Sequence, residues 1–434
     1  MKVLYDISVL GKSIECNRAR TGIFRVVESI AAGLVAEPTV EVNFYAMENL
    51  QSSYRYLHTH TSFHEALLLD DLSSFHTASC RCSQHKQLHM EVERLKIYIH
   101  KAKQTTSSAR LPLEISAEML RFLTRLTRPL RLTLPHMPTT VDIFHSPFLP
   151  IPPEVKLSKK VKKFLTIYDL IPLLHPEFFE FREDHFLTKV VKSIDGKTRI
   201  LTISHSTKND LCAYIPGLDP DHVTVTHLAA SSLFYPVYNQ VARSHVLEKY
   251  SIPPKPYVLS LSTLEPRKNI DHTIRCFFRL VQEEKIADLN LVLVGSKGWN
   301  YDKIFAELAR YDFAKEQVIV TGYVSDEDLS ALYSGALAFV YPSLYEGFGL
   351  PPLEAMKCGV PVITSNTSSL PEVVGDAGIL VDPRDADALC AAMLSLYKDS
   401  GRREMLARRS LKRASEFSWK RCVNETVRAY KRAL

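Results

Sequence analysis

The chain of 434 residues is longer than one ordinary hydrophobic core supports, so two domains are expected. Its net charge of +6 is modest at this length and it contains no nucleic-acid-binding motif, which argues against nucleic acid as a partner. It contains no apolar run of membrane-spanning length, no signal-peptide core, and no zinc or redox spacing among its eight cysteines, so we expect a cytoplasmic protein with reduced thiols.

The first elements predict one half of a Rossmann-like domain. Lys2–Tyr5 is predicted to be a strand, and a polar loop follows it as far as Gly22. A helix is expected to begin near Ile23, because apolar residues then recur at helical spacing, and Val40–Tyr45 is the next predicted strand. This order is typical of nucleotide-binding α/β folds. Taken by itself, Gly22 indicates only the turn before the helix.

Two basic stretches lie in the first half of the chain. Arg121–Arg131 places arginines among leucines, and Lys156–Lys163 is rich in lysine. A basic amphipathic stretch can lie on an anionic membrane face, and the alternative is a core helix with a solvated arginine face. A weak contact with the inner face of a membrane therefore stays open as a hypothesis.

Polar residues follow two predicted strands of the first half. His145 comes directly after Val141–Phe144, and Tyr168 and Asp169 come directly after Phe164–Ile167. Ligands bind beyond the carboxyl ends of parallel strands in α/β sheets. These three residues are therefore candidates for a ligand pocket.

A basic pair follows the first strand predicted in the second half, Tyr257–Ser262. Arg267 and Lys268 lie in the turn between this strand and a helix that begins near Ile270. Arginine binds phosphate through a planar fork and lysine binds it as a point charge. The pair predicts a phosphate site, and the alternative is two ordinary surface cations.

The most regular stretch is LAFVYPSLYEGFGLPPLEAMKCGVPVI, residues 337–363. It predicts a buried strand, a loop with two glycines, and a helix whose first turn accepts Pro351 and Pro352. A glycine-rich loop that leads into a helix N-terminus can bind an anion. Glu346 and Glu354 flank it, and carboxylates suit the vicinal hydroxyls of a sugar. The alternative is that Glu354 only complements the helix dipole and the glycines only turn the chain.

Helices dominate the end of the chain. Ser369 and Glu372 have the spacing of a capping box that opens a helix. Asp385–Lys398 is predicted to be a late helix, and the chain ends in a further helical segment after Phe417.

Glu346 and Glu354, with seven residues between them, resemble the E-x7-E signature of family 4, or group 1, retaining glycosyltransferases. The likeness extends through SLPEVVGDAGILVDP, and weaker likenesses appear at residues 204–210, 234–236 and 417–419. The resemblance implies an α/β protein of the GT-B fold, with two Rossmann-like domains that face each other across a cleft. It implies an acceptor-binding domain over 1–235, a donor-binding domain over 236–415, and a C-terminal helix over 416–434 that returns to the first domain.

The resemblance also implies roles for individual residues. Glu354 would bind the donor ribose, Glu346 would lie beside the transferred sugar, and Arg267 and Lys268 would bind the diphosphate. Many family members have histidine immediately before the aspartate at 169, whereas this chain has Tyr168. Asp169 is counted with the catalytic candidates, and both His145 and Tyr168 are counted with the acceptor or sugar pocket. Further donor contacts are implied for Gly22, Tyr323, Val324, Gly347, Phe348, Gly349 and Leu350.

The function implied is transfer of a hexose, with mannose or rhamnose as candidates, from a nucleotide diphospho-sugar to a hydroxyl of a glycan or glycolipid. Bacterial surface-polysaccharide assembly is the implied setting. No metal and no cofactor beyond the donor is expected, because the basic pair and a helix N-terminus can stabilise the leaving diphosphate. Two rivals stay open: a catalytically silent nucleotide-sugar-binding subunit, which Tyr168 favours, and a non-hydrolysing epimerase of the same fold.

Overall fold

The computed structural model describes residues 1–11, 22–46, 52, 53, 56, 75–77, 141–179, 185–296, 298, 301–311 and 316–434. Their internal contacts group them into two compact units. The first unit holds the described residues within 1–166 together with 190–199 and 430–434, and the second holds those within 167–189 and 200–429. The predicted basic segment Arg121–Arg131 lies outside the described residues. The domain boundaries at 235 and 416 stay predictions.

A seven-stranded sheet has the order β3-β2-β1-β4-β5-β6-β7. The central strand β1 pairs in parallel with β2 on one side and with β4 on the other. Its residues Val3 and Leu4 are completely buried, as is expected of a strand covered on both faces. The bounds are β1 Lys2–Asp6, β2 Glu41–Ala46, β3 Phe75–Thr77, β4 Ile143–Ser146, β5 Lys162–Ile167, β6 Arg199–Thr202 and β7 Val223–Val225.

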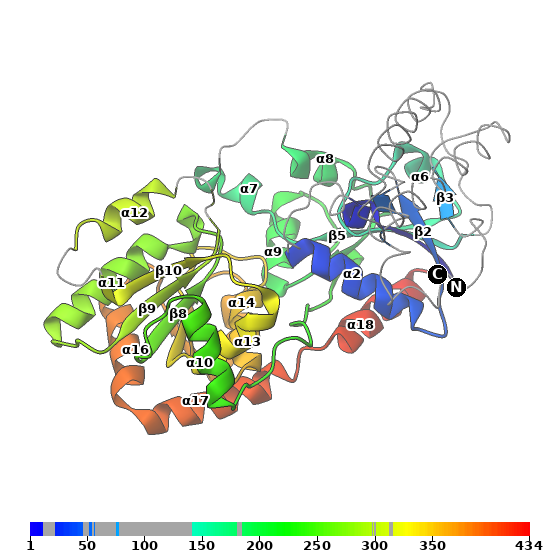
Figure 1. Ribbon diagram of the computed structural model, residues 1–434. Coiled ribbons are helices and arrows are strands. Elements are labelled where there is room, and N and C mark those ends of the chain that lie inside the picture. The colour runs from blue at the N-terminus through cyan, green and yellow to red at the C-terminus, as the bar shows by residue number, and fades with distance from the viewer. Residues whose placement is uncertain are drawn as a thin grey trace, which may run out of the picture. The chain divides into compact units, whose positions relative to one another are not determined.

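A second sheet of six strands has the order β10-β9-β8-β11-β12-β13, and its strand pairs are also parallel. Strands that pair in this order need crossover connections, and helices provide them. Figure 1 shows β8, β9 and β10 with α11, α12 and α13 around them. The bounds are β8 Tyr257–Leu261, β9 Asn290–Val294, β10 Val318–Gly322, β11 Ala338–Tyr341, β12 Val362–Ser365 and β13 Ile379–Val381.

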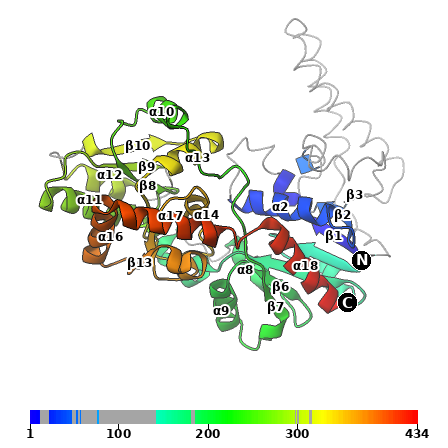
Figure 2. The same ribbon diagram turned by 90° about the horizontal axis from the view of Figure 1, so that it is seen from below.

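The helices bury one apolar face each. The predicted first helix is confirmed as α2, Gly22–Val35, which buries Val26, Val27, Ile30 and Leu34. Figure 2 shows α17 alongside α14, and these two helices are in contact. The other helices are α6 Pro153–Leu157, α7 Ile171–Leu174, α8 Phe186–Lys192, α9 His205–Tyr214, α10 Gln240–Lys249, α11 Ile270–Glu283, α12 Asp302–Leu308, α13 Asp326–Gly335, α14 Leu350–Lys357, α15 Leu370–Val374, α16 Ala386–Lys398, α17 Ser400–Ala414 and α18 Trp419–Ala433. In the described part of the chain, no helix combines the length and apolar character needed to cross a membrane.

The predicted capping box at Ser369 is wrong. Ser369 does hold the N-cap position of α15, but its hydroxyl does not bond to the helix. It donates instead to the carbonyl oxygens of Glu346 and Phe348, at 2.9 and 2.8 Å. Glu372 accepts hydrogen bonds from the first amides of α9. Ser369 and Glu372 have the spacing of a capping box, but both side chains form hydrogen bonds with residues outside α15.

Candidate functional site

The loop between β11 and α14 needs glycine at two positions. A Cβ atom on Gly347 would lie 2.7 Å from the carbonyl oxygen of Tyr168 and 2.9 Å from Cβ of Asp169. Gly349 has φ of 110°, in the left-handed region that side chains disfavour. It directly precedes Leu350, the first residue of α14. The two glycines therefore bring the loop against Asp169 and start the helix.

Glu346 lies at the centre of a dense polar cluster. Its Oε1 accepts hydrogen bonds from Nζ of Lys268 at 2.6 Å, the hydroxyl of Tyr341 at 2.8 Å and the hydroxyl of Ser343 at 2.6 Å. Its Oε2 lies 2.8 Å from Nη1 of Arg267. Only 10% of its side chain is exposed, so this carboxylate is held in one orientation by charged and neutral donors.

The basic pair lies in a short 3-10 turn, Pro266–Lys268, that joins β8 to α11. The backbone of this turn is tied to the glutamate loop, because the carbonyl oxygen of Arg267 accepts the amide of Leu344 at 2.9 Å. Lys268 also donates to the hydroxyl of Tyr341 at 2.6 Å. The structure therefore brings Arg267 and Lys268 together with Glu346.

Glu346 and Arg267 stabilise each other's charge. Burial raises the pKa of Glu346, but Arg267 and Lys268 outweigh it and lower that pKa to about 2. Burial lowers the pKa of Arg267, and Glu346 and Glu265 raise it above its ordinary value. Glu346 is therefore an anion, and Arg267 a cation, throughout the physiological range.

Glu265 is a member of this cluster that the sequence analysis missed. It is 2% exposed, and its Oε1 accepts a hydrogen bond from Nη2 of Arg267 at 2.6 Å. Arg267 is thus held between two carboxylates, Glu265 and Glu346, while Nη1 also donates to the carbonyl oxygen of Tyr345. An acidic residue two positions before the arginine, directly before the turn that holds the basic pair, was the signal that could have identified it.

Asp169 lies beside the same loop. Its Oδ1 accepts the amide of Ile171 at 3.0 Å and so begins α7. Burial raises the pKa of Asp169, whereas the Ile171 amide and Arg267 oppose that rise. The arrangement confirms that Asp169 follows β5. It also places a second carboxylate near the cationic pair.

The contacts of Tyr168 are those of a buried structural residue. Its side chain is 9% exposed, and burial raises its pKa, so the phenol stays protonated. Its carbonyl oxygen accepts a hydrogen bond from the hydroxyl of Thr207 at 3.1 Å. A protonated, buried phenol cannot replace histidine as a base.

His145 is not in the loop after its strand, and that prediction is wrong. The strand β4 continues through Ser146, and His145 is completely buried within it. Its ring nitrogens bond to the hydroxyl of Tyr430 at 2.5 Å and the hydroxyl of Thr166 at 2.8 Å. Burial lowers its pKa to about 3. Both nitrogens are therefore engaged by side chains of the first unit. Its role in a sugar pocket stays untested.

Glu354 is the fifth residue of α14, beyond the end of the helix where a carboxylate complements the dipole best. It is 7% exposed, and the hydroxyl of Tyr333 donates to its Oε2 at 3.4 Å. A buried carboxylate is costly unless polar groups compensate it, so dipole complementation alone is a poor account of this residue.

The other predicted donor residues lie in different surroundings. Phe348 is 3% exposed, its ring packs against Phe417, and its carbonyl oxygen accepts the hydroxyl of Ser369. Tyr323 is 58% exposed after β10, and its neighbour Val324 is buried. Gly22 is the exposed first residue of α2 in the first unit. Their contacts with a donor stay predictions.

Known proteins are similar to this chain in sequence and in fold. Residues 246–413 match the family described as Glycosyl transferases group 1. O-antigen chain mannosyltransferase B of Escherichia coli is 37% identical over 290 residues, which are 67% of this chain and 74% of that protein. Serotype-specific mannosyltransferase WbdA of Escherichia coli is 32% identical over 278 residues, 63% of this chain but only 34% of the relative.

Two solved structures show the same fold at low sequence identity. Sucrose-phosphate synthase from Thermosynechococcus elongatus superposes with a TM-score of 0.64 at 18% identity, over 100% of this chain and 98% of its own. HepE from Anabaena, in complex with UDP, superposes with a TM-score of 0.61 at 15% identity, over 100% of both chains. The fold is therefore GT-B, and the extent of the mannosyltransferase match places this chain in the group 1 glycosyltransferase family.

Proposed function

We propose that this glycosyltransferase moves a hexose from a nucleotide diphospho-sugar to a hydroxyl group with retention at the anomeric carbon. The observation that carries the proposal is the cluster in which Glu346 meets Arg267 and Lys268, beside Asp169 and the N-terminus of α14. Bond breaking between sugar and diphosphate creates negative charge on one side and an electron-poor sugar on the other. The cations can stabilise the negative charge on the diphosphate, and the carboxylate can stabilise the electron-poor sugar.

Arg267 is the group that we assign to the diphosphate, together with Lys268. Nε of Arg267 is buried and lacks a hydrogen-bond partner among the described residues. An unsatisfied buried donor is costly, and a bound phosphate oxygen would remove that cost. A phosphate group would also draw Arg267 and Lys268 partly away from Glu346, which frees this carboxylate to face the sugar. No metal is assigned to this step.

The names of the relatives support a choice of donor sugar and acceptor. Two of them are named as mannosyltransferases, and one of these as an O-antigen chain enzyme, which supports mannose as the sugar and a growing surface glycan as the acceptor. Rhamnose remains the second candidate sugar. The chain spans only about a third of WbdA, so that protein's full activity is not assigned to this chain.

Transfer in purified protein tests this proposal. Mannose, rhamnose and glucose donors would be incubated with a panel of lipid-linked and free glycan acceptors, with and without chelator. We expect one donor to be consumed with formation of a glycoside of unchanged anomeric configuration, which NMR coupling constants report. Donor binding without turnover on any acceptor would favour the silent binding subunit, and release of an epimerised sugar would favour the epimerase.

Glu354→Gln is expected to weaken the binding of nucleoside diphosphate by about 1.5–3 kcal/mol, the range for hydrogen bonds to a charged group. The reason is that glutamine keeps the shape but loses one strong acceptor for the ribose hydroxyls. Calorimetric titration measures the affinity. Because Glu354 is buried, the melting temperature must be recorded as well.

Tyr333→Phe is the matched control for this prediction. It removes the hydroxyl that contacts Glu354 and leaves the carboxylate in place. Its nucleotide affinity should stay near that of the wild type. A Glu354→Gln protein with wild-type affinity and a normal melting temperature would show that the ribose binds elsewhere.

Only part of the lysine-rich stretch 156–163 is exposed and could contact a membrane. Lys163 points inward: it is 4% exposed, and its Nζ lies 2.8 Å from Oδ2 of Asp195. Lys159, Lys160 and Lys162 are exposed, and Leu157 before them is 78% exposed at the end of α6. An exposed leucine among lysines suits the boundary of an anionic membrane.

Lys159→Glu with Lys160→Glu is expected to abolish sedimentation with phosphatidylserine vesicles at low salt. Wild-type binding should itself fall at physiological salt, where charges are screened beyond roughly 8 Å. The matched control replaces Lys255 and Lys303, which are exposed lysines of the second unit, with glutamate. Equal binding of wild-type protein to neutral and anionic vesicles would contradict the membrane hypothesis.

A further inference from the structure

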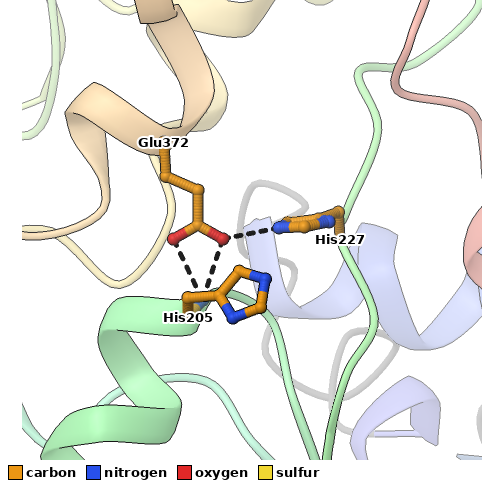
Figure 3. A group of neighbouring side chains, drawn as sticks. All are labelled: His205, His227 and Glu372. Carbon is orange, nitrogen blue, oxygen red and sulfur yellow. Dashed lines mark hydrogen bonds and ion pairs between the residues drawn. The ribbon is translucent and has the colours of Figure 1, made fainter.

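Two histidines and a glutamate from three separate elements come together in the second unit. His205 is the first residue of α9, His227 follows β7, and Glu372 lies in α15. Figure 3 shows the Glu372 carboxylate directed at the His227 ring and at the main chain of His205, with the His205 ring beside them. Nε2 of His227 is 2.5 Å from Oε1 of Glu372, and one donor atom from each residue lies within 4.8 Å of the others.

Two of the three groups are held in place by their surroundings. Both carboxylate oxygens of Glu372 accept the amide of His205, at 2.8 and 3.0 Å. The carbonyl oxygen of Glu372 also accepts Nη2 of Arg413 at 2.6 Å. The ring of His227 packs edge-on against Phe417. Metal sites depend on such outer contacts, because they orient the ligands before the ion arrives.

We propose that His205, His227 and Glu372 bind one Zn²⁺ ion. Two imidazoles and a carboxylate are a donor set that zinc accepts, whereas Mg²⁺ and Ca²⁺ prefer oxygen ligands. Ligand distances near 2.1 Å around a tetrahedral ion put the ligand atoms about 3.4 Å apart. His227 and Glu372 must separate slightly to admit the ion, and the exposed ring of His205 must move closer to both. Water would complete the shell.

The site has a structural consequence that is separate from sugar transfer. The ion would join α9, the segment after β7, and α15 within the second unit. Ser369, which begins α15, holds the carbonyl oxygens of Glu346 and Phe348. Zinc would therefore stiffen the support of the glycine loop without touching the reacting groups. We expect chelation to lower the melting temperature and to leave transfer intact.

Calorimetric titration of the chelator-treated full chain with ZnCl₂ tests the proposal. The wild type should bind one ion per chain, its melting temperature should rise with zinc, and MgCl₂ should give no binding. His205→Ala should weaken zinc binding by on the order of 100-fold, since even loss of an outer-shell partner costs 10–100-fold. This variant keeps the backbone amide that Glu372 accepts, so it should fold normally.

Glu372→Gln provides a second variant, and His245→Ala is the matched control. Glutamine keeps an acceptor for the α9 amides but loses the anionic ligand, and zinc affinity should fall as for His205→Ala. His245 is an exposed histidine on α10, so its removal should leave zinc affinity unchanged. Absence of zinc binding in the wild type would overturn the proposal, and the trio would then be only a hydrogen-bonded helix cap. Equal zinc affinity in all four proteins would overturn it as well, by placing the ion elsewhere.

Discussion

Alanine at Arg267 or at Lys268 is expected to lower kcat by on the order of 10²-fold or more, the scale measured for one electrostatic donor in an active site. The diphosphate carries more negative charge as the glycosidic bond breaks than it does in the intact donor. Cations beside it therefore stabilise the transition state more than the bound substrate, and kcat should fall further than KM rises. Steady-state kinetics with the donor identified by the transfer assay provide both constants.

The free nucleoside diphosphate supplies an independent check. It bears the charge of the leaving group, so both variants should bind it more weakly in a calorimetric titration. Arg279→Ala is the matched control, because Arg279 is a partly exposed arginine on α11 whose partners are the surface residues Glu283 and Asp387. If both variants keep the wild-type kcat while the control behaves normally, the diphosphate binds at another place.

The stability of these variants must be recorded together with the kinetics. Loss of Arg267 leaves Glu265 and Glu346 without a shared cation, and both carboxylates are buried. Removal of one partner from a buried ion pair commonly costs several kcal/mol. Arg267→Lys keeps the charge but loses the planar guanidinium group. It therefore tests whether the site requires bidentate hydrogen bonding or only a positive charge. We expect it to retain more stability than alanine while kcat still falls.

The sequence predicted the glycine loop well because local chemistry dominates there. Gly347 and Gly349 have backbone requirements that few other residues meet, and Pro351 fits the first turn of α14. The turn with Arg267 and Lys268 was also predicted from the sequence, because a strand, a polar turn and an amphipathic helix follow one another directly. Their meeting with Glu346 follows from the adjacency of β8 and β11 in a parallel sheet.

The errors concern residues whose state depends on distant partners. Burial of Glu354 depends on Tyr333 of α13, and the inward turn of Lys163 depends on Asp195. Ser369 has a capping sequence, yet its hydroxyl bonds to carbonyl groups twenty or more residues away. Periodicity cannot identify such partners. His145 was misplaced for a smaller reason, because the last two residues of a buried strand can be polar when other elements satisfy them.

Replacement of Glu346 by glutamine is expected to abolish measurable transfer and to lower the free energy of unfolding by roughly 3 kcal/mol at neutral pH. A pKa lowered from 4.5 to about 2 corresponds to a stabilisation of that size, and loss of one partner from a buried ion pair costs about 3–5 kcal/mol. Arg267 would keep Glu265 as a partner, whereas Lys268 would retain only the hydroxyl of Tyr341 among its present hydrogen bonds. Urea unfolding of both proteins measures the difference.

The pH dependence of that difference distinguishes the ion pairs from simple packing. The pKa of Glu346 is lowered in the folded protein, so its contribution is fully present above about pH 4.5 and is lost as the pH falls toward 2. The stability gap between wild type and Glu346→Gln should therefore be constant from pH 7 to about 5 and should narrow below that. Ser343→Ala, which removes one neutral donor to Glu346, is the control, and its smaller deficit should change less over the same range. A gap for Glu346→Gln that stays constant down to pH 3 would show that shape, and not charge, makes Glu346 necessary for folding.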